Sequence, residues 1–167
     1  MPGEAKLVFA GGSSHTDAYV ASLKKQADSR VIFTGWLSGD ALEEVLTNTA
    51  VLVLPSDIEG LSLSLLDAMG AGICVLASDI LENKEAIGET GFLFKSGDVQ
   101  ELRRMLTILL ANPDLRAISG KKARARGQEN YLWDDVTAQT EKLYCDLMRH
   151  APVGDLSPSV VPNSKAA

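Results

Sequence analysis

The sequence has few of the residues that build metal sites and covalent cross-links. Its 167 residues include only 2 cysteines and 2 histidines. Cys74 lies in an apolar run and Cys145 in a helical pattern, and neither stands near His15 or His150 at a zinc-ligand spacing. We therefore expect no bound metal and two reduced, structural thiols, which is typical of a cytoplasmic protein.

Positive charge and long apolar stretches are also scarce. Lys and Arg total 16 against 22 Asp and Glu, so the formal net charge is −6. This balance disfavours nucleic-acid binding, which selects basic surfaces. No apolar run approaches the roughly 20 residues of a membrane span, and residues 1–4 lack the basic and then apolar pattern of a secretory leader. The length and the ordinary composition predict about one folded domain.

What the sequence does contain is a series of short apolar runs at regular intervals. Four runs without polar alternation occupy residues 7–10, 31–33, 51–54 and 73–77, and a weaker fifth occupies residues 91–94. Such runs are typical of strands that are buried on both faces of a parallel sheet. The intervening segments carry helical patterns and are long enough for crossover helices. The pattern predicts an α/β fold with a Rossmann-like open parallel sheet and flanking helices.

The C-terminal half carries helical signals in place of further strands. Asp98, with a glutamate three residues later, predicts a helix N-cap, and Pro113 predicts the start of another helix. A last amphipathic helix is predicted from Trp133 onward. We assign residues 1–150 to one folded domain. Residues 151–167 hold three prolines and no periodicity, so we predict a disordered tail there.

The loop at residues 55–62 is the most informative of the loops that follow the predicted strands. Open α/β sheets bind ligands at the carboxyl ends of their strands. Here a buried strand is followed by Glu59 and Gly60, and a helix is predicted to begin near Ser62. The unpaired N–H groups of a first helical turn form an anion site together with the helix dipole, and Gly60 allows the backbone to approach a ligand closely. With Ser62 or Ser64 as an added hydroxyl donor, the loop predicts a phosphate site that needs no basic patch.

Two carboxylates flank this predicted site. Asp67 follows Glu59 by eight residues, which corresponds to a rise of about 12 Å along a helix. That separation fits hydroxyls at the two ends of an extended ligand better than a general acid–base pair. The alternative is that the helix dipole alone favours Glu59 and that Asp67 is a surface residue.

The residues around this loop resemble family 4 of the retaining glycosyltransferases, enzymes of the GT-B class that are built from two Rossmann-like halves. Pro55, Ser56, Glu59 and Gly60, followed by residues 65–69, are similar to the Glu-x7-Glu signature of that family. The resemblance covers about residues 6–149. Its other matching segments are residues 31–35, 75–78, 91–94 and 131–133.

The resemblance implies a role for each matching position. Glu59 would be the catalytic residue and would contact the donor sugar. Asp67, which stands where glutamate is usual, would bind the ribose. The other implied donor-binding residues are Gly60, Leu61 and Ser62 at the diphosphate, Gly35, Trp36 and Leu37 beside the base, and Gly11 and Gly12 after the first strand.

The resemblance also implies a reaction and a partner domain. Members transfer a sugar from a nucleotide diphosphate sugar with retained configuration, without a cofactor and without an obligatory metal. Their nucleotide domain begins with an earlier βα unit that carries an Arg and a Lys, and an N-terminal acceptor-binding domain precedes it. We therefore expect residues 1–150 to form a nucleotide-sugar-binding domain that is most of one GT-B half and lacks its first βα unit. We expect the chain to be inactive alone. The base, the sugar and the acceptor are not indicated.

Other functions stay open on the residues alone. A non-catalytic nucleotide- or protein-binding module has the same fold, and a sugar-nucleotide epimerase fits the fold only. A phosphoacceptor receiver domain would need an acidic cluster at the strand ends, which the first and third strands lack. His15 is interpreted as a loop or cap residue. A solvated helix face, or a weak peripheral contact with an anionic membrane, would explain the basic cluster of Arg116, Lys121, Lys122, Arg124 and Arg126.

Overall fold

The computed structural model describes residues 5–12 and 16–150 of the chain. The chain divides into two compact units, Met1–Tyr131 and Leu132–Ala167, and each is described by itself. The predicted tail at residues 151–167 and His15 lie outside the described residues.

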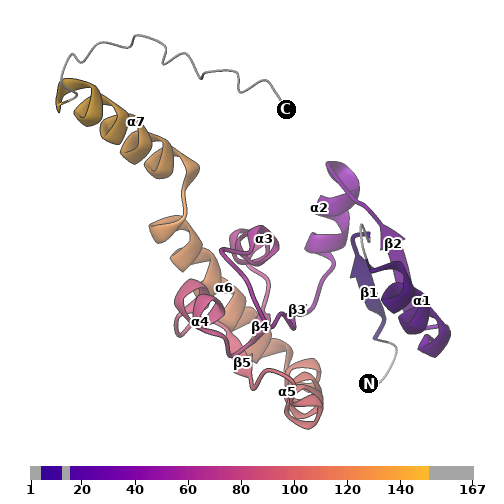
Figure 1. Cartoon of the computed structure of the whole chain (residues 1–167). Helices are drawn as coiled ribbons and strands as arrows, with labels where there is room; N and C mark the ends of the chain where they lie inside the picture. Colours follow the sequence, from indigo (N-terminus) through magenta and orange to yellow (C-terminus); the bar gives the residue numbers. More distant parts are fainter. Residues whose placement is uncertain (1–4, 13–15, 151–167) are drawn as a thin grey trace, which may run out of the picture. The chain divides into compact units, whose positions relative to one another are not determined.

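The first unit alternates strands and helices as the apolar runs predict, and a strand lies at each run (Figure 1). Every strand pairs with its neighbours in parallel. The elements in chain order are β1 (Leu7–Ala10), α1 (Asp17–Gln26), β2 (Val31–Gly35), α2 (Asp40–Thr47), β3 (Leu52–Leu54), α3 (Leu63–Ala71), β4 (Val75–Ser78), α4 (Leu81–Ile87), β5 (Phe92–Phe94), α5 (Val99–Ala111) and α6 (Pro113–Asn130).

The strands form two hydrogen-bonded groups. β1 pairs with β2, and β4 lies between β3 and β5. Every residue of β4 is buried, as expected for a strand covered on both faces, because this strand has a neighbour at each edge and helices around it. The same expectation is wrong for β1, where Val8 and Phe9 are 39% and 38% exposed. Among the described residues, β1 and β2 pair only with each other, so their apolar side chains are only partly covered.

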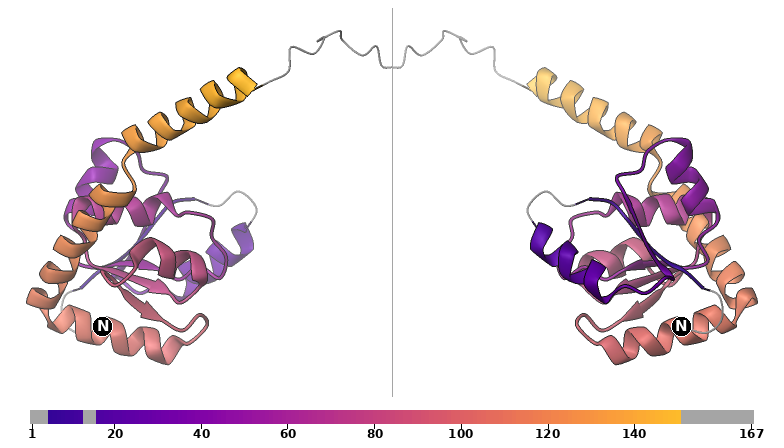
Figure 2. Two further views of the ribbon diagram at one scale, coloured as in Figure 1. Left: turned by 90° about the vertical axis from the view of Figure 1, so that its left-hand side faces the viewer. Right: turned by 90° about the vertical axis from the view of Figure 1, so that its right-hand side faces the viewer.

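The core of the first unit is built by α3, β4, α4 and α6. Leu65 and Met69 of α3 and Ile87 of α4 are fully buried in it. α6 runs beside α3 (Figures 1 and 2). The two approach closely because Gly120 of α6 has no Cβ, and a Cβ at that position would lie 2.0 Å from the carbonyl oxygen of Gly72. This packing holds α6 against the turn between α3 and β4.

The predicted helix starts after β5 are confirmed. The Asp98 carboxylate accepts hydrogen bonds from the backbone N–H groups of Gln100 and Glu101 at 3.0 and 2.9 Å, so it caps α5. Glu101 does not complete a reciprocal capping box, because its carboxylate accepts the N–H of Lys95 at 2.9 Å. α6 begins at Pro113, as predicted.

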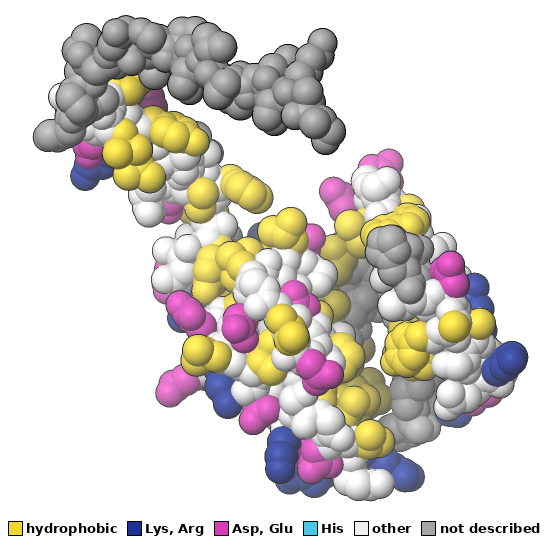
Figure 3. Space-filling model, viewed as in Figure 1, with side chains coloured by type: hydrophobic (Ala, Val, Ile, Leu, Met, Phe, Trp, Pro, Cys, Tyr) yellow, Lys and Arg dark blue, Asp and Glu magenta, His cyan; other side chains and the backbone are white. Residues whose placement is uncertain are grey.

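The second unit contains the predicted amphipathic helix as α7 (Trp133–His150). Its apolar side chains Trp133, Val136, Leu143 and Leu147 are between 47% and 73% exposed, and hydrophobic side chains line the helix in Figure 3. No helix in the described part of the chain is both long and apolar enough to cross a membrane.

Candidate functional site

The loop at residues 55–62 connects β3 to α3, and the helix begins where the sequence predicts. α3 starts at Leu63 with Ser62 as its N-cap residue, but the Ser62 side chain makes no capping hydrogen bond. The backbone ladder begins with Leu66 N–H donating to the Ser62 carbonyl at 3.1 Å. The backbone N–H groups that come before Leu66 at the start of α3 therefore have no acceptor among the described residues. They are available to donate hydrogen bonds to an anion. The hydroxyls of Ser62 and Ser64 lie 3.0 Å apart at the same helix end.

The outer side of this loop is open. Gly60 is exposed, and a Cβ at that position would meet no atom within 4 Å. The side chains of Ile58 and Leu61 are 88% and 51% exposed. Among the described residues, no contact requires a glycine at position 60. That Gly60 allows a ligand to approach the backbone closely stays a prediction.

The carboxylate of Glu59 is held inside its own loop. The Ser56 hydroxyl donates a 2.6 Å hydrogen bond to Glu59 Oε1, and Glu59 is half-buried. The loop is tied to the sheet at two further points. The Ser78 hydroxyl, at the end of β4, donates to the Ser56 carbonyl, and the Ser96 hydroxyl, after β5, donates to Asp57 Oδ1. Glu59 therefore stands on a fastened loop at the carboxyl ends of β3 and β4.

Asp67 lies on α3 and is exposed, and its carboxylate makes no hydrogen bond to a described residue. It follows the first residue of the helix by four positions, which is a rise of about 6 Å. No hydrogen bond joins it to Glu59 within the described residues. The assignment of the two carboxylates to separate ends of a ligand stays a prediction.

The predicted residues of the first strand pair lie together at the carboxyl ends of β1 and β2. Gly11 N–H donates to the Gly35 carbonyl at 2.8 Å, and Gly35 has a φ of +69°, which favours glycine. A Cβ at Gly12 would lie 2.3 Å from Nε1 of Trp36, so the indole in its present position packs directly on the glycine backbone. The indole of Trp36 is 79% exposed, and Leu37 is half-buried.

The predicted site residues thus fall into two clusters. One cluster is at the ends of β1 and β2, and the other is in the loop at residues 55–62 and the start of α3. No hydrogen bond between described residues joins the first cluster to the second.

Sequence reasoning missed the residues that fasten the loop, which are Ser78, Asp79, Asn83 and Ser96. The Asp79 carboxylate accepts the N–H of Ser96 at 2.9 Å and lies 3.5 Å from Nζ of Lys84. These contacts, led by the hydrogen bond from Ser96, hold the pKa of Asp79 below its usual value of 3.8. The only available signal was the polar character of residues 78–85, which suggested a loop after a strand, whereas α4 begins at Leu81. Their partners 17 to 39 residues away leave no local pattern.

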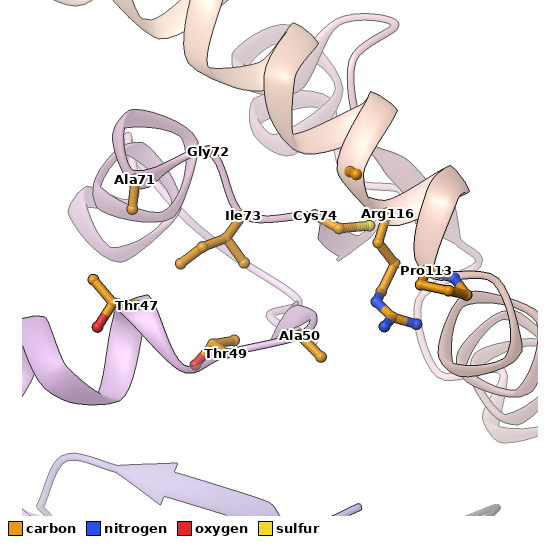
Figure 4. Close-up of a pocket in the computed structure, with 10 residues that line it drawn as sticks. Thr47, Thr49, Ala50, Ala71, Gly72, Ile73, Cys74, Pro113 and Arg116 are labelled. Atoms are coloured by element: carbon orange, nitrogen blue, oxygen red, sulfur yellow. The ribbon is translucent and has the colours of Figure 1, made fainter.

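A pocket of about 320 Å³ lies elsewhere, among the end of α2, the turn before β4 and the start of α6 (Figure 4). Its residues Ile73 and Cys74 precede β4, so it lies at the amino ends of the strands, away from the loop at residues 55–62. The guanidinium of Arg116 already donates to the carbonyls of Leu109 and Leu110, at 2.6 and 3.0 Å. Burial raises the pKa of the Cys74 thiol. With no carboxylate in its lining, this pocket does not match the predicted donor site.

The basic cluster on α6 has a partly structural use. Besides Arg116, Arg126 donates to the carbonyls of Ala86 and Glu85, at 2.8 and 2.7 Å. The three other members of the cluster are exposed. The proposed membrane contact stays a prediction. Over the described residues, the structure brings together no group of three or more His, Cys, Asp or Glu that could hold a metal ion.

Comparison with known proteins identifies the family. Residues 2–112 match the family model described as Glycosyl transferases group 1. Sulfoquinovosyl transferase SQD2 of Arabidopsis thaliana is 36% identical over 143 residues, which cover 81% of this chain and 27% of that protein. The sucrose-phosphate synthase structure from Thermosynechococcus elongatus is 27% identical with a TM-score of 0.79, covering 86% of this chain and 39% of that one. Anabaena Alr3699/HepE in complex with UDP-glucose is 19% identical with a TM-score of 0.79, covering 85% and 41%.

The last of these similarities shows the fold alone, whereas the family model and the plant relative show the family. The chain spans roughly a quarter to two-fifths of the length of these relatives. The resemblance stated from the residues is confirmed, as is the Rossmann-like parallel fold of a GT-B half. The chain belongs to the group 1 glycosyl transferases.

Proposed function

We propose that this chain binds the nucleotide diphosphate sugar for a retaining glycosyltransferase that needs no obligatory metal. The observation that carries the proposal is the uncapped start of α3 beside the anchored carboxylate of Glu59. Free amides suit a diphosphate, and a carboxylate suits sugar hydroxyls. Membership of the group 1 glycosyl transferases supports both assignments.

The diphosphate binds at the first turn of α3, with Gly60, Leu61 and Ser62 supplying backbone donors. Hydrogen bonds to a charged group contribute about 1.5–3 kcal/mol each, so a few amides replace a basic patch. As the bond between the sugar and the diphosphate breaks, negative charge builds on the leaving diphosphate. Amides and a helix dipole that are already in place stabilise this charge without reorganisation, which lowers the barrier.

Glu59 accepts hydrogen bonds from the hydroxyls of the donor sugar. An ionised carboxylate has about four acceptor positions on its two oxygens. The hydroxyl of Ser56 uses one of them on Oε1, which leaves Oε2 free for the sugar. The serine thereby fixes the orientation of the carboxylate and leaves its remaining acceptor positions available to the sugar hydroxyls.

Asp67 binds the ribose, and the cluster at the ends of β1 and β2 lies beside the base. Aspartate is one methylene shorter than the usual glutamate, so a bridging water completes the contact. Gly11, Gly12 and Gly35 bring backbone close to the nucleotide, and Trp36 with Leu37 flanks the base.

Transfer requires more than this chain. The relatives are longer than the chain. We propose that a further domain supplies the acceptor site and that a βα unit, which begins the nucleotide-binding half, supplies an Arg and a Lys that also contact the diphosphate. The isolated chain binds the donor and transfers nothing.

Titration calorimetry with UDP, GDP and ADP, each with and without its sugar, tests the donor assignment. We expect one of the three nucleoside diphosphates to bind, and to bind also in the presence of EDTA, because no metal is required. The attached sugar should increase the affinity. Glu59→Gln should remove that increase and leave the diphosphate affinity unchanged. The control is Glu89→Gln, an exposed glutamate that precedes β5 at the amino ends of the strands.

Two results would contradict the proposal. One is that no nucleotide binds, which leaves a protein-binding module of the same fold. The other is that Glu59→Gln behaves like Glu89→Gln, which leaves a nucleotide-binding module without a donor-sugar site. Sugar transfer by the isolated chain would separately refute the claim that it is inactive. In the transferase that contains this chain, NMR of the product should show a retained anomeric configuration.

A further inference from the structure

A continuous series of hydrogen bonds runs from α4 to Glu59. The side-chain amide of Asn83 donates to the Ser78 hydroxyl at 3.0 Å and to the Ser78 carbonyl at 3.2 Å. The Ser78 hydroxyl donates to the carbonyl of Ser56. The Ser56 hydroxyl donates to Glu59 Oε1 at 2.6 Å. Four residues that are up to 27 positions apart in the sequence are thereby linked.

The direction of each hydrogen bond in this series is determined by chemistry. The Ser78 carbonyl only accepts, so the Asn83 side chain must turn its NH₂ group toward Ser78. The same NH₂ group then makes the Ser78 hydroxyl an acceptor. A hydroxyl has a single proton, and that of Ser78 is therefore left for the Ser56 carbonyl. The series has one arrangement and no equivalent alternative.

The two ends of the series differ in burial. Ser78 and Asn83 are 0% and 1% exposed, whereas the loop they reach is exposed at Asp57 and Ile58. Buried polar groups that are fully hydrogen-bonded give a unique and rigid arrangement. Asn83 and Ser78 therefore form a rigid support in the core, to which an otherwise open loop is tied.

We propose that Asn83 and Ser78 are positioning residues that hold the Glu59 carboxylate in the orientation used by the donor sugar. The proposal rests on the proposed donor-binding function. Neither residue touches the ligand, and each acts through the Ser56 carbonyl and hydroxyl. The second tie, from Ser96 to Asp57, fastens the same loop from the segment after β5 but does not involve the Glu59 side chain.

The first measurement is made on this chain without ligand. NMR three-bond couplings should show a single χ1 rotamer for Glu59 in the wild type and averaged rotamers in Ser78→Ala and Asn83→Ala. Ser56→Ala should give the same averaging, and Ser56→Thr, which keeps the hydroxyl, should not. Ser119→Ala is the matched control, because Ser119 is also buried and its hydroxyl donates to a carbonyl, that of Thr90 at 2.7 Å.

The second measurement separates positioning from general damage to the fold. The affinities of UDP-glucose, ADP-glucose and GDP-mannose are measured, and each is divided by the affinity of the corresponding nucleoside diphosphate. This ratio reports the contribution of the sugar to binding. We expect Ser78→Ala to lower this ratio about tenfold, in line with the large effects of small misplacements in active sites. In a Glu59→Ala background Ser78→Ala should lower it no further, because both changes remove the same interaction. A structural role would lower the affinity of the diphosphate and of its sugar equally.

Each outcome decides the proposal. A single Glu59 rotamer in both Ser78→Ala and Asn83→Ala overturns it, as does an undiminished ratio or full additivity with Glu59→Ala. If Ser78→Ala does not fold, Ser78→Cys keeps the shape with a much weaker donor and takes its place. If the wild type binds no nucleotide, the proposed function fails, and the rotamer measurement still decides whether these residues position Glu59.

Discussion

Replacing Gly120 by alanine tests the close packing of α6 on the turn that precedes β4. Gly120 is buried on α6, and a Cβ there would lie 2.0 Å from the carbonyl oxygen of Gly72 and 2.8 Å from its carbonyl carbon. Real Cβ atoms essentially never approach another atom within 3.0 Å, so α6 and the turn before β4 must separate by at least 1 Å. Both contacting atoms belong to the backbone, so no side chain can rotate away to relieve the overlap.

The magnitude follows from two opposing effects. Overpacking a well-packed core costs about 1–3 kcal/mol, and the upper end applies to an overlap with backbone. Alanine gains about 1 kcal/mol over glycine in a helix. We therefore expect Gly120→Ala to lower the free energy of unfolding by about 2 kcal/mol. Gly127, on the same helix, has its nearest would-be neighbour at 3.7 Å, which is ordinary contact. Gly127→Ala should raise the free energy of unfolding by up to about 1 kcal/mol.

Urea unfolding followed by helical circular dichroism measures both variants against the wild type. The melting temperatures should move in opposite directions, by about 2–4 °C for each kcal/mol in a chain of this size. Gly120→Ala with wild-type or higher stability would refute the packing of α6 on the turn at Gly72. Equal losses of stability in Gly120→Ala and Gly127→Ala would show that the effect comes from substitution in α6 in general and not from the contact with Gly72.

Three further predictions concern single side chains. Asp98→Ala should lower the free energy of unfolding by about 1 kcal/mol in urea unfolding, because it removes the N-cap of α5; an unchanged midpoint would contradict this. Because the folded-state pKa of Asp79 is lowered, chiefly by the N–H of Ser96, its carboxylate stabilises the fold above about pH 4, and this contribution is lost as the pH falls through the folded pKa. An NMR titration midpoint for Asp79 at or above 3.8 would be incompatible with that contact. A disulfide reagent at pH 8 should modify Cys145 in the folded chain and reach buried Cys74 only after unfolding, so a Cys145→Ser variant that still reacts at once would count against the burial of Cys74.

The order and type of the elements could be predicted because they depend on local pattern. Each apolar run became a strand, and the start of α3 at Leu63 followed from the polar loop before it. The caps at Asp98 and Pro113 are also local signals. The exposure of β1 could not be predicted, because it depends on which strands pair with it and not on its own residues.

The sequence allowed prediction of the residues proposed to contact the ligand, but not of the residues that hold them in place. Glu59 and Ser62 were identifiable from the loop itself, because a carboxylate and a helix start are read within a few residues. Ser78 and Asn83 were not identifiable, because a serine and an asparagine after a strand are ordinary turn residues. Their role emerges only when the fold brings them to Ser56, 22 or more positions earlier in the chain.

The central claim is that free backbone amides at the start of α3 bind the diphosphate. The most direct test is an amide ¹H–¹⁵N NMR titration of the ¹⁵N-labelled chain with the nucleoside diphosphate that binds in calorimetry. We predict that the largest chemical-shift changes fall on residues 60–65, with a smaller set on Gly11, Gly12 and Gly35. Changes centred instead on the pocket around Thr49, Ile73 and Arg116, with residues 60–65 unaffected, would contradict the claim.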